Sequence, residues 1–199
     1  MSTSRPDGPH RKRVKHVHEP GDLHELTFST YRRKPLLTND RWRGYFCDAL
    51  AEALPAAGWQ LAAWVVMPEH VHLLVWPVEP TDADVPGLLR RTKRPCSLRI
   101  KDDLTAAGSR LLDDLTVRER PGRTAFRFWQ EGPGYDRNLR TPAAVRAAID
   151  YIHANPVRRG LVNRPTDWVW SSARAFAPDV PATADDPPLT PLPPHLWDG

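Results

Sequence analysis

The stretch VVMPEHVHLLVW (residues 65–76) places two histidines, His70 and His72, inside an otherwise apolar run. Successive side chains of a β-strand point to opposite faces, so the two imidazoles share one face while Val71 and Leu73 face the other side. Two imidazoles on one face of a strand can hold a single divalent ion. Because an H-x-H motif is short, two half-buried polar residues on a sheet remain the alternative interpretation.

The segments around this stretch alternate between strand-like and helix-like patterns, which differ in apolar spacing and in turn and capping signals. In chain order the sequence predicts a strand at 23–30, a helix at 38–57, strands at 59–67 and 70–78 joined as a hairpin, a helix at 84–103 that Pro95 breaks or kinks, a strand at 126–130 and a helix at 141–155. This order predicts a ferredoxin-like (RRM-like) α+β fold, in which helices cover one face of an antiparallel sheet and leave the other face free for a ligand. Residues 104–124 show no decisive pattern.

The clearest helix in the chain is TPAAVRAAIDYIHAN (141–155). Thr141 suits the N-cap position, and Pro156 is expected to end the helix, because the residue before a proline avoids the helical region. Tyr151 and Asn155 are four residues apart and therefore lie on one face of this helix. A rigid helix that presents a phenol and an amide together could dock on the histidine face; a tyrosine that only packs, with its hydroxyl at the rim, is the alternative.

Charge is unevenly distributed along the 199 residues. The first 174 residues hold all 28 basic residues and 20 of the 24 acidic residues, a net charge of +8 against +4 for the whole chain. A basic body suggests a polyanionic partner such as nucleic acid, with ordinary solubility as the alternative. Composition divides the chain into a basic flexible arm (1–20), a central domain (21–176) and a proline-rich tail (177–199), which either packs on the body through its leucines and Trp197 or trails.

The sequence also argues against several classes of protein. Cys47 and Cys96 are isolated, so the chain has no disulfide framework and no C-x-x-C motif. Its apolar runs are far shorter than the roughly 18 residues that a membrane span needs, and its N-terminus lacks the pattern of a secretory signal. We therefore expect a cytoplasmic protein without a membrane partner.

Four blocks of sequence resemble, in the same order, the single-tyrosine HUH transposases, whose name denotes two histidines around a bulky hydrophobe. The blocks are VVMPEHVHLLV, FWQEGPGYDRNLR, YIHANPVRRGLV and WVWSSARAF. The first resembles the HUH motif, and the other three resemble the downstream blocks of one branch, the REP-associated tyrosine transposases. The resemblance extends from about His24 to Phe176, and its specificity lies in the order of the four blocks rather than in any single one.

This resemblance implies a ferredoxin-like fold and a metal-dependent strand-transfer activity on single-stranded DNA hairpins such as REP-like repeats, performed at the nucleoid. By position, His70 and His72 match metal ligands, Tyr151 matches the nucleophile, and Asn155 takes the place of a further polar ligand. The family usually has asparagine before the first histidine, where this chain has Glu69. Strand alternation predicts that Glu69 faces away from the histidines.

The residue types suit this chemistry. A phenol attacks a phosphodiester poorly, so a bound Mg²⁺ or Mn²⁺ that stabilises charge on the phosphate would assist it. Attack by Tyr151 would give a 5′-phosphotyrosine and a free 3′-OH, and a DNA 3′-OH could reverse the step and rejoin strands. Because Mg²⁺ prefers oxygen ligands, a pair of histidines favours Mn²⁺.

Cationic and aromatic residues outside this set are candidates for DNA binding, through phosphate contacts or stacking on unpaired bases. They are Arg32, Arg33, Lys34, Arg90, Arg91, Lys93, Arg94, Trp129, Arg158 and Arg159. Arg158 and Arg159 are the strongest candidates, because they directly follow the end of the tyrosine helix. Each of the other cations could equally be a solvated surface charge.

Two alternatives stay open at this level. A catalytically inactive module of the same fold could bind single-stranded or hairpin nucleic acid without cutting it, although intact His70, His72 and Tyr151 argue against degeneration. An HUH replication or mobilisation initiator is a further possibility, but those proteins commonly carry extra domains, which we do not expect in 199 residues. The sequence does not decide between a monomer and a homodimer.

Overall fold

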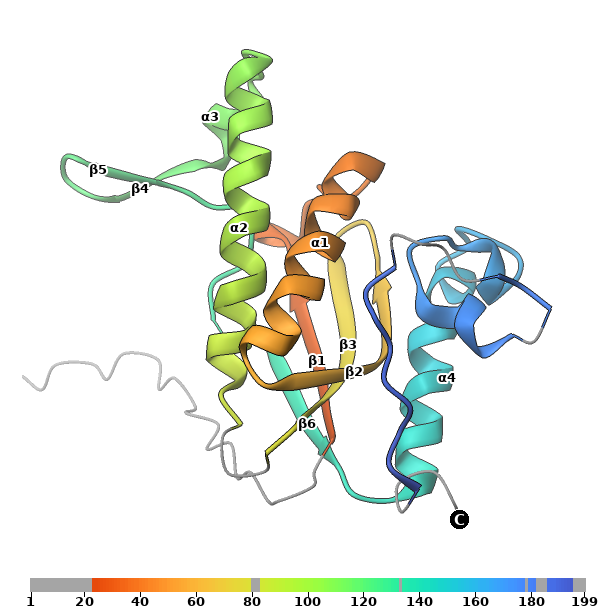
Figure 1. Cartoon of the computed structure of the whole chain (residues 1–199). Coiled ribbons are helices and arrows are strands. Elements are labelled where there is room, and N and C mark those ends of the chain that lie inside the picture. The colour runs from red at the N-terminus through yellow and green to blue at the C-terminus, as the bar shows by residue number, and fades with distance from the viewer. Residues whose placement is uncertain (1–22, 80–82, 133, 178, 182–185, 195–199) are drawn as a thin grey trace, which may run out of the picture.

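A four-stranded antiparallel sheet forms the centre of the molecule (Figure 1). The structure is a computed structural model, and it describes residues 23–79, 83–132, 134–177, 179–181 and 186–194; the predicted N-terminal arm lies outside these residues. The strands follow the order β2-β3-β1-β6 across the sheet. Their bounds are Leu23–Ser29 for β1, Trp59–Val66 for β2, His70–Pro77 for β3 and Tyr135–Leu139 for β6.

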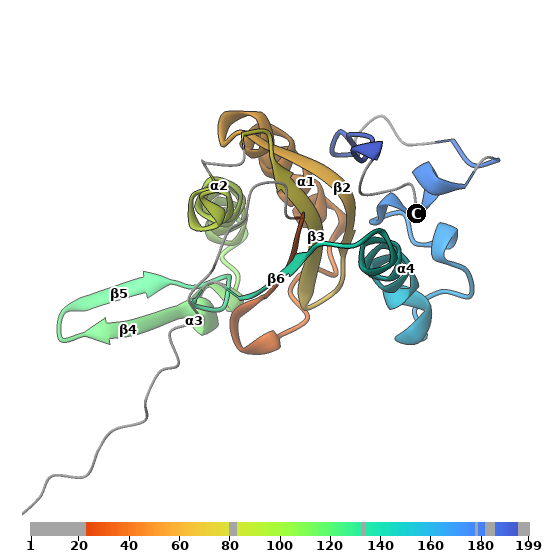
Figure 2. The same ribbon diagram turned by 90° about the horizontal axis from the view of Figure 1, so that it is seen from below.

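Helices lie on both sides of this sheet (Figure 2). α1 (Asp40–Ala56) and α2 (Val85–Ala106) cover one face, and α4 (Pro142–Arg158) packs against the other. Short 3-10 turns are found at Tyr31–Arg33, Pro165–Asp167 and Ser172–Phe176. The predicted ferredoxin-like α+β fold, with a further tyrosine-bearing helix, is therefore confirmed. Among the residues described, no helix has the length and apolar character needed to cross a membrane.

The side chains of β3 divide between the two faces as strand alternation predicts. Val71 and Leu73 are fully buried in the larger hydrophobic core, which α1 and α2 cover. Leu74 belongs to the smaller core beneath α4. His70 and His72 share the face of Leu74, so both imidazoles lie on the α4 side of the sheet.

Capping signals mark the helix boundaries. Asn39 accepts the Arg41 N–H at 2.9 Å at the start of α1, and Thr141 accepts the Ala144 N–H at 3.2 Å at the start of α4. Gly58 follows α1 with a φ of +70°, a left-handed conformation that glycine adopts without steric cost. Thr141 therefore acts as predicted, and Gly58 allows the chain to turn into β2.

Two prolines expected to interrupt helices do not end them. α2 continues through Pro95, where the missing hydrogen bond falls on an exposed face and water can satisfy the Arg91 carbonyl. α4 continues through Pro156 into its last turn, and the Arg159 N–H still donates to the Asn155 carbonyl at 3.0 Å. The prediction that Pro156 ends the helix was wrong, because a proline this close to the C-terminus removes a single bond.

The fourth strand of the sheet is not the predicted one. Within 126–130, Trp129 makes only an isolated bridge with Thr30. β6 takes the place beside β1, with Tyr135 opposite Thr27. Its sequence YDRNL has no apolar alternation, so the pattern pointed to the more apolar segment before it.

The ambiguous region 104–124 contains a short helix and a two-stranded ribbon. α3 (Leu111–Leu115) leads into β4 (Thr116–Arg120), which pairs antiparallel with β5 (Arg123–Phe126). The ribbon projects away from the sheet and helices (Figures 1 and 2).

The chain after α4 covers the outer edge of the sheet at β2. In the tail, the Thr190 N–H donates to the Leu61 carbonyl at 2.8 Å, and Leu192 packs against the smaller core. A covered edge cannot pair with another chain. The predicted contacts of Leu196 and Trp197 lie outside the described residues.

Candidate active site

His70, His72 and Tyr151 come together between β3 and α4. The centroids of the two imidazole rings lie 4.8 Å apart, edge to face at 87°. The Tyr151 ring lies 5.4 Å from the His72 ring, again at 87°. His70 and His72 are only 5% and 4% exposed, whereas Tyr151 is 39% exposed. The phenol therefore borders solvent beside an enclosed pair of imidazoles.

Each histidine uses its Nδ1 atom for a hydrogen bond within the protein. His70 Nδ1 lies 3.1 Å from Glu69 Oε1; an ionised carboxylate only accepts, so Nδ1 donates and Nε2 keeps its lone pair. His72 Nδ1 lies 2.8 Å from Thr27 Oγ1, and its buried Nε2 has no hydrogen-bond partner among the described residues. A partner on one ring nitrogen and an open second nitrogen is typical of metal-binding histidines.

Burial keeps both imidazoles neutral at neutral pH. It lowers the pKa of His72 to about 3, with smaller contributions from His70 and Arg33. Burial also lowers the pKa of His70, against the opposing effect of Glu69. Neutral imidazoles can bind a divalent ion without first losing a proton.

Asn155 is the candidate third ligand. It lies one helical turn after Tyr151 and is 7% exposed. Its Nδ2 donates to the Tyr151 carbonyl at 2.9 Å, which leaves Oδ1 free to act as an acceptor. No group of three or more His, Cys, Asp and Glu residues suited to a metal occurs in the described part of the chain, and the Asn155 amide offers an oxygen ligand of another type. Two imidazoles, one of them with an unpartnered Nε2, and an amide oxygen fit Mn²⁺ better than Mg²⁺.

A pocket of about 510 Å³ opens beside these residues. It is lined by Glu25, Thr27, His72, Tyr135, Arg137, Ala147, Ala148 and Tyr151. Glu25 pairs with Arg137 at 3.1 Å between β1 and β6. Tyr135 is 54% exposed, so the pocket presents a second phenol besides Tyr151. Sequence reasoning missed Glu25 and Thr27 as pocket residues, although alternation in LHELTFS would have placed both on one face of β1.

Glu69 faces the site, contrary to the prediction from strand alternation. Its Oε1 accepts from Arg159 Nη1 at 2.8 Å and lies 3.7 Å from Arg33 Nη2, in addition to its contact with His70. Glu69 lies in the turn before β3, so the alternation of the strand does not reach it. The carboxylate therefore holds two guanidinium groups beside the histidine pair.

The other cations predicted near the site differ in their surroundings. The Arg158 guanidinium lies 5.3 Å from the centroid of the Tyr151 ring, so it borders the site. After β1, Arg32 is exposed and Lys34 Nζ lies 3.7 Å from Asp114 Oδ2. Arg158 thus joins Arg33 and Arg159 at the site.

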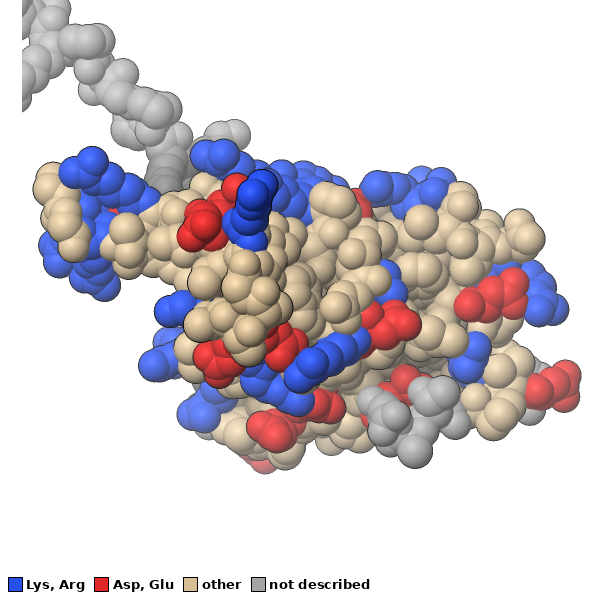
Figure 3. All heavy atoms as spheres, turned by 90° about the horizontal axis from the view of Figure 1, so that it is seen from above, with Lys and Arg blue, Asp and Glu red and all other residues tan. Residues whose placement is uncertain are grey.

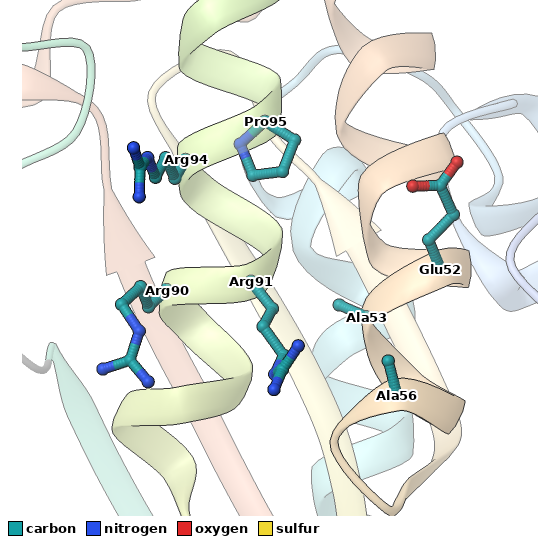
Figure 4. A pocket seen from close by; sticks show the side chains of 7 residues that line it. All are labelled: Glu52, Ala53, Ala56, Arg90, Arg91, Arg94 and Pro95. Atoms are coloured by element: carbon teal, nitrogen blue, oxygen red, sulfur yellow. The ribbon is translucent and has the colours of Figure 1, made fainter.

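The predicted cluster belongs to α2, which lies across the sheet from α4 (Figure 2), whereas strand alternation places the histidines on the α4 side. A second pocket of about 460 Å³ between α1 and α2 is lined by Glu52, Ala53, Ala56, Arg90, Arg91, Arg94 and Pro95. In Figure 4, Arg91 points toward α1, whereas Arg90 and Arg94 point away from it. These three arginines can therefore contact nucleic acid only away from the histidine pair.

Lys93 and Trp129 are directed into the protein. Lys93 Nζ lies 4.3 Å from the Phe28 ring centroid, and burial lowers its pKa to about 8. Trp129 is 8% exposed, packs against Phe28 and Phe46, and donates through Nε1 to the Lys93 carbonyl at 3.1 Å. Base stacking needs an exposed ring face, so this burial argues against the predicted stacking role of Trp129. A half-buried Lys93 is likewise poorly placed for a phosphate.

The chain is similar to known proteins in sequence and in fold. No family model matches the chain. The REP-associated tyrosine transposase of Escherichia coli (strain K12) is 29% identical over 113 residues, which cover 57% of this chain and 53% of that protein. The chain thus spans about half the length of the curated relative it matches. A solved structure of a REP-associated tyrosine transposase bound to a REP hairpin matches the fold with a TM-score of 0.60 and 22% identity, over 91% of this chain and 100% of that one. The predicted family resemblance is confirmed: this chain is similar to the REP-associated tyrosine transposases in sequence and in fold.

Proposed function

We propose that this chain is a transposase-like, single-tyrosine DNA nickase and strand transferase. The observation that carries the proposal is the contact between the Tyr151 ring and His72, because it joins an accessible phenol to two neutral, oriented imidazoles. The similarity to a REP-associated tyrosine transposase, and the REP hairpin bound in the similar structure, support single-stranded hairpin DNA as the substrate.

Tyr151 is the proposed nucleophile, since it lies both in the pocket and against the histidine pair. Its Oη attacks the scissile phosphorus and loses its proton, while the bond from phosphorus to the 3′ oxygen breaks. The products are a 5′-phosphotyrosine and a strand with a free 3′-OH. Because the covalent link keeps the phosphoester, a DNA 3′-OH can attack it and rejoin strands without another energy source.

His70, His72 and Asn155 would hold a divalent ion in this site. When bound, Mn²⁺ or Mg²⁺ stabilises the charge on the non-bridging phosphate oxygens and helps to orient the scissile bond. Glu69 and Thr27 orient the two imidazoles through their Nδ1 atoms, which would leave each Nε2 available to hold the ion.

Arg33, Arg158 and Arg159 would position the DNA backbone beside the reacting phosphate. Their contacts support this role, because Arg33 and Arg159 are held by Glu69 beside His70 and Arg158 lies over the Tyr151 ring. Phosphate contacts of this kind fix register without reading sequence. The exposed Arg90, Arg91 and Arg94 of α2 would contact a different part of the DNA.

A labelled single-stranded hairpin, incubated with the protein and Mn²⁺ and then run on a denaturing gel, tests the proposal. We expect the wild type to form a covalent adduct that Tyr151→Phe abolishes and that EDTA prevents. Tyr135→Phe is the matched control, because it removes a phenol from the same pocket and should leave the adduct in place. Hairpin binding without an adduct in the wild type would favour the inactive binding module instead.

A further inference from the structure

The β4–β5 ribbon projects from the body and contributes to the hydrophobic core only at its base, where Phe126 packs against that core. Its base is anchored, because Leu115 and Phe128 on either side are buried and the Arg127 N–H donates to the Leu115 carbonyl at 2.7 Å. Beyond this base, all residues from 118 to 124 are exposed. The exposed part of the ribbon is therefore free to serve a purpose other than stability.

The exposed part of the ribbon is rich in arginine. Arg118, Arg120 and Arg123 lie in it, and Glu119 is its single acidic residue. Glu119 pairs with Arg123 at 3.1 Å and with Arg127 at 3.2 Å. Neither Arg118 nor Arg120 forms an ion pair with any residue that the structure describes. Figure 3 shows basic side chains gathered around the tip of the projection at the left of the molecule.

The dimensions of the ribbon match a groove of duplex DNA. A five-residue strand extends over roughly 17 Å, and its two strands lie about 4.8 Å apart. The major groove of B-DNA, about 12 Å wide and 8.5 Å deep, admits a two-stranded ribbon. Arginine suits both sides of such a groove, because its guanidinium forms paired hydrogen bonds with phosphates and with guanine.

The base of the ribbon is joined to the end of the sheet where the histidines lie. The Phe128 carbonyl accepts the Tyr31 N–H at 2.7 Å, and the Gln130 N–H donates to the Ser29 carbonyl at 2.8 Å. Ser29 is paired in turn with His70 in the register of β1 and β3. A duplex held by the ribbon would therefore lie at the same end of the sheet as the candidate active site.

We infer that the β4–β5 ribbon lies in the major groove of the paired stem of a DNA hairpin and grips it through Arg118 and Arg120. The adjoining unpaired segment then extends to the Tyr151 pocket. The identity of the substrate rests on the proposed function, but the contact between ribbon and stem does not depend on cutting.

Equilibrium binding by fluorescence anisotropy tests the inference, with EDTA present to prevent cutting. The two probes are a DNA hairpin and an unpaired DNA strand of equal length. Arg118→Ala/Arg120→Ala is expected to weaken hairpin binding about tenfold or more and to reduce the slope of log affinity against log salt by about 2. Binding of the unpaired strand should stay within about twofold of the wild type, since single strands offer no major groove.

The matched control is Arg99→Ala/Lys101→Ala, which removes two exposed cations from α2. Both affinities of this variant should stay within twofold of the wild type. An equal loss in this control would overturn the inference, because it would show a general effect of charge. Hairpin binding within twofold of the wild type in the ribbon variant would also overturn it, as would equal losses for the two probes.

Two further measurements distinguish DNA binding by the ribbon from RNA binding and from the strand-transfer activity. An RNA hairpin that binds as tightly as the DNA hairpin, with the same dependence on Arg118 and Arg120, would overturn the assignment to DNA, because the major groove of A-form RNA is too narrow for a ribbon. Ribbon-dependent hairpin binding without any Tyr151 adduct would refute strand transfer and leave the inference standing. A Tyr151 adduct together with hairpin binding that does not depend on Arg118 and Arg120 would support strand transfer and refute the inference about the ribbon.

Discussion

Thr27→Val exchanges a hydroxyl for a methyl group of similar size at the point where β1 supports His72. Thr27 Oγ1 lies 2.8 Å from His72 Nδ1, and His72 Nε2 has no partner among the described residues. The substitution therefore leaves an imidazole that is only 4% exposed without its hydrogen bond to β1. Neither the tautomer nor the orientation of the ring is then held for an ion.

The size of the effect follows from the burial of this ring. A buried polar group left without its hydrogen bond costs about 1–3 kcal/mol, and about 1.4 kcal/mol corresponds to tenfold in an equilibrium constant. We therefore expect Thr27→Val to lower Mn²⁺ affinity about 10–100-fold, in line with the loss of other partners of metal-binding histidines. In the metal-free protein, the free energy of unfolding should fall by about 1–2 kcal/mol.

Isothermal titration calorimetry with Mn²⁺ measures the affinity, and urea unfolding measures the stability. Thr27→Ser is the matched control, because it keeps the hydroxyl and loses only a methyl group; its Mn²⁺ affinity should stay close to that of the wild type. Wild-type Mn²⁺ affinity in Thr27→Val would refute the claim that this hydroxyl orients His72 as a ligand.

Three further predictions concern residues around the site. Glu69→Gln removes the charge that orients the adjacent histidine, and it should weaken Mn²⁺ binding about tenfold in the same titration. Gly134→Ala should lower the free energy of unfolding in urea by about 2 kcal/mol or more, because φ is +79° and the new Cβ would lie 2.3 Å from the Thr27 carbonyl oxygen. Gly132→Ala is the control, because φ is +101° there but no atom lies within 4 Å of the new Cβ; it should lower the free energy of unfolding by about half as much. Burial lowers the pKa of His153 to about 4, below the value near 6.5 of an unfolded chain. The unfolded chain therefore binds a proton first as the pH falls below 6.5, and the folded state loses about 3 kcal/mol of stability by pH 4. His153→Gln should lose correspondingly less stability between pH 7 and pH 4 in metal-free urea titrations.

Each of these predictions has an outcome that contradicts it. Unchanged Mn²⁺ binding in Glu69→Gln would mean that the carboxylate does not support its histidine. Equal destabilisation by the two glycine variants would show that the close approach to β1 is unimportant. An identical loss of stability with acid in the wild type and in His153→Gln would mean that this imidazole is not held neutral in the folded state.

Much of the central fold could be predicted from local pattern. Because His70 and His72 are two residues apart, strand alternation places both on one face and Val71 and Leu73 on the other, and the structure places Val71 and Leu73 in the larger core as expected. The capping residue Thr141 likewise marks the start of α4. These features depend on neighbours close in sequence, which is why pattern alone was sufficient.

Two of the failures involve partners distant in sequence, and the failure at Pro156 has a local cause. β6 is a strand because Tyr135 pairs with Thr27, and nothing in its polar sequence records that pairing. Pro156 fits inside α4 because it lies in the last turn, two residues before the helix ends at Arg158. Trp129 has an aromatic ring suited to stacking, but packing against Phe28 and Phe46 removes it from the surface.

The candidate site divides in the same way. The family resemblance, rather than the spacing of residues, predicted that Tyr151 and Asn155 belong to the same site as the two histidines. Thr27 and Glu69 could not be predicted as supports for the imidazoles, because one requires the register of β1 with β3 and the other the shape of a turn.

The most direct test of the central claim is to locate the DNA on the protein. The wild type is trapped with a labelled hairpin and Mn²⁺, digested with protease and nuclease, and analysed by peptide mass spectrometry. We expect a nucleotide-phosphate mass on the peptide at Tyr151 and none on the peptide at Tyr135, the other phenol of the pocket. Modification at Tyr135 instead, or hairpin cleavage with no modified tyrosine, would contradict the central claim.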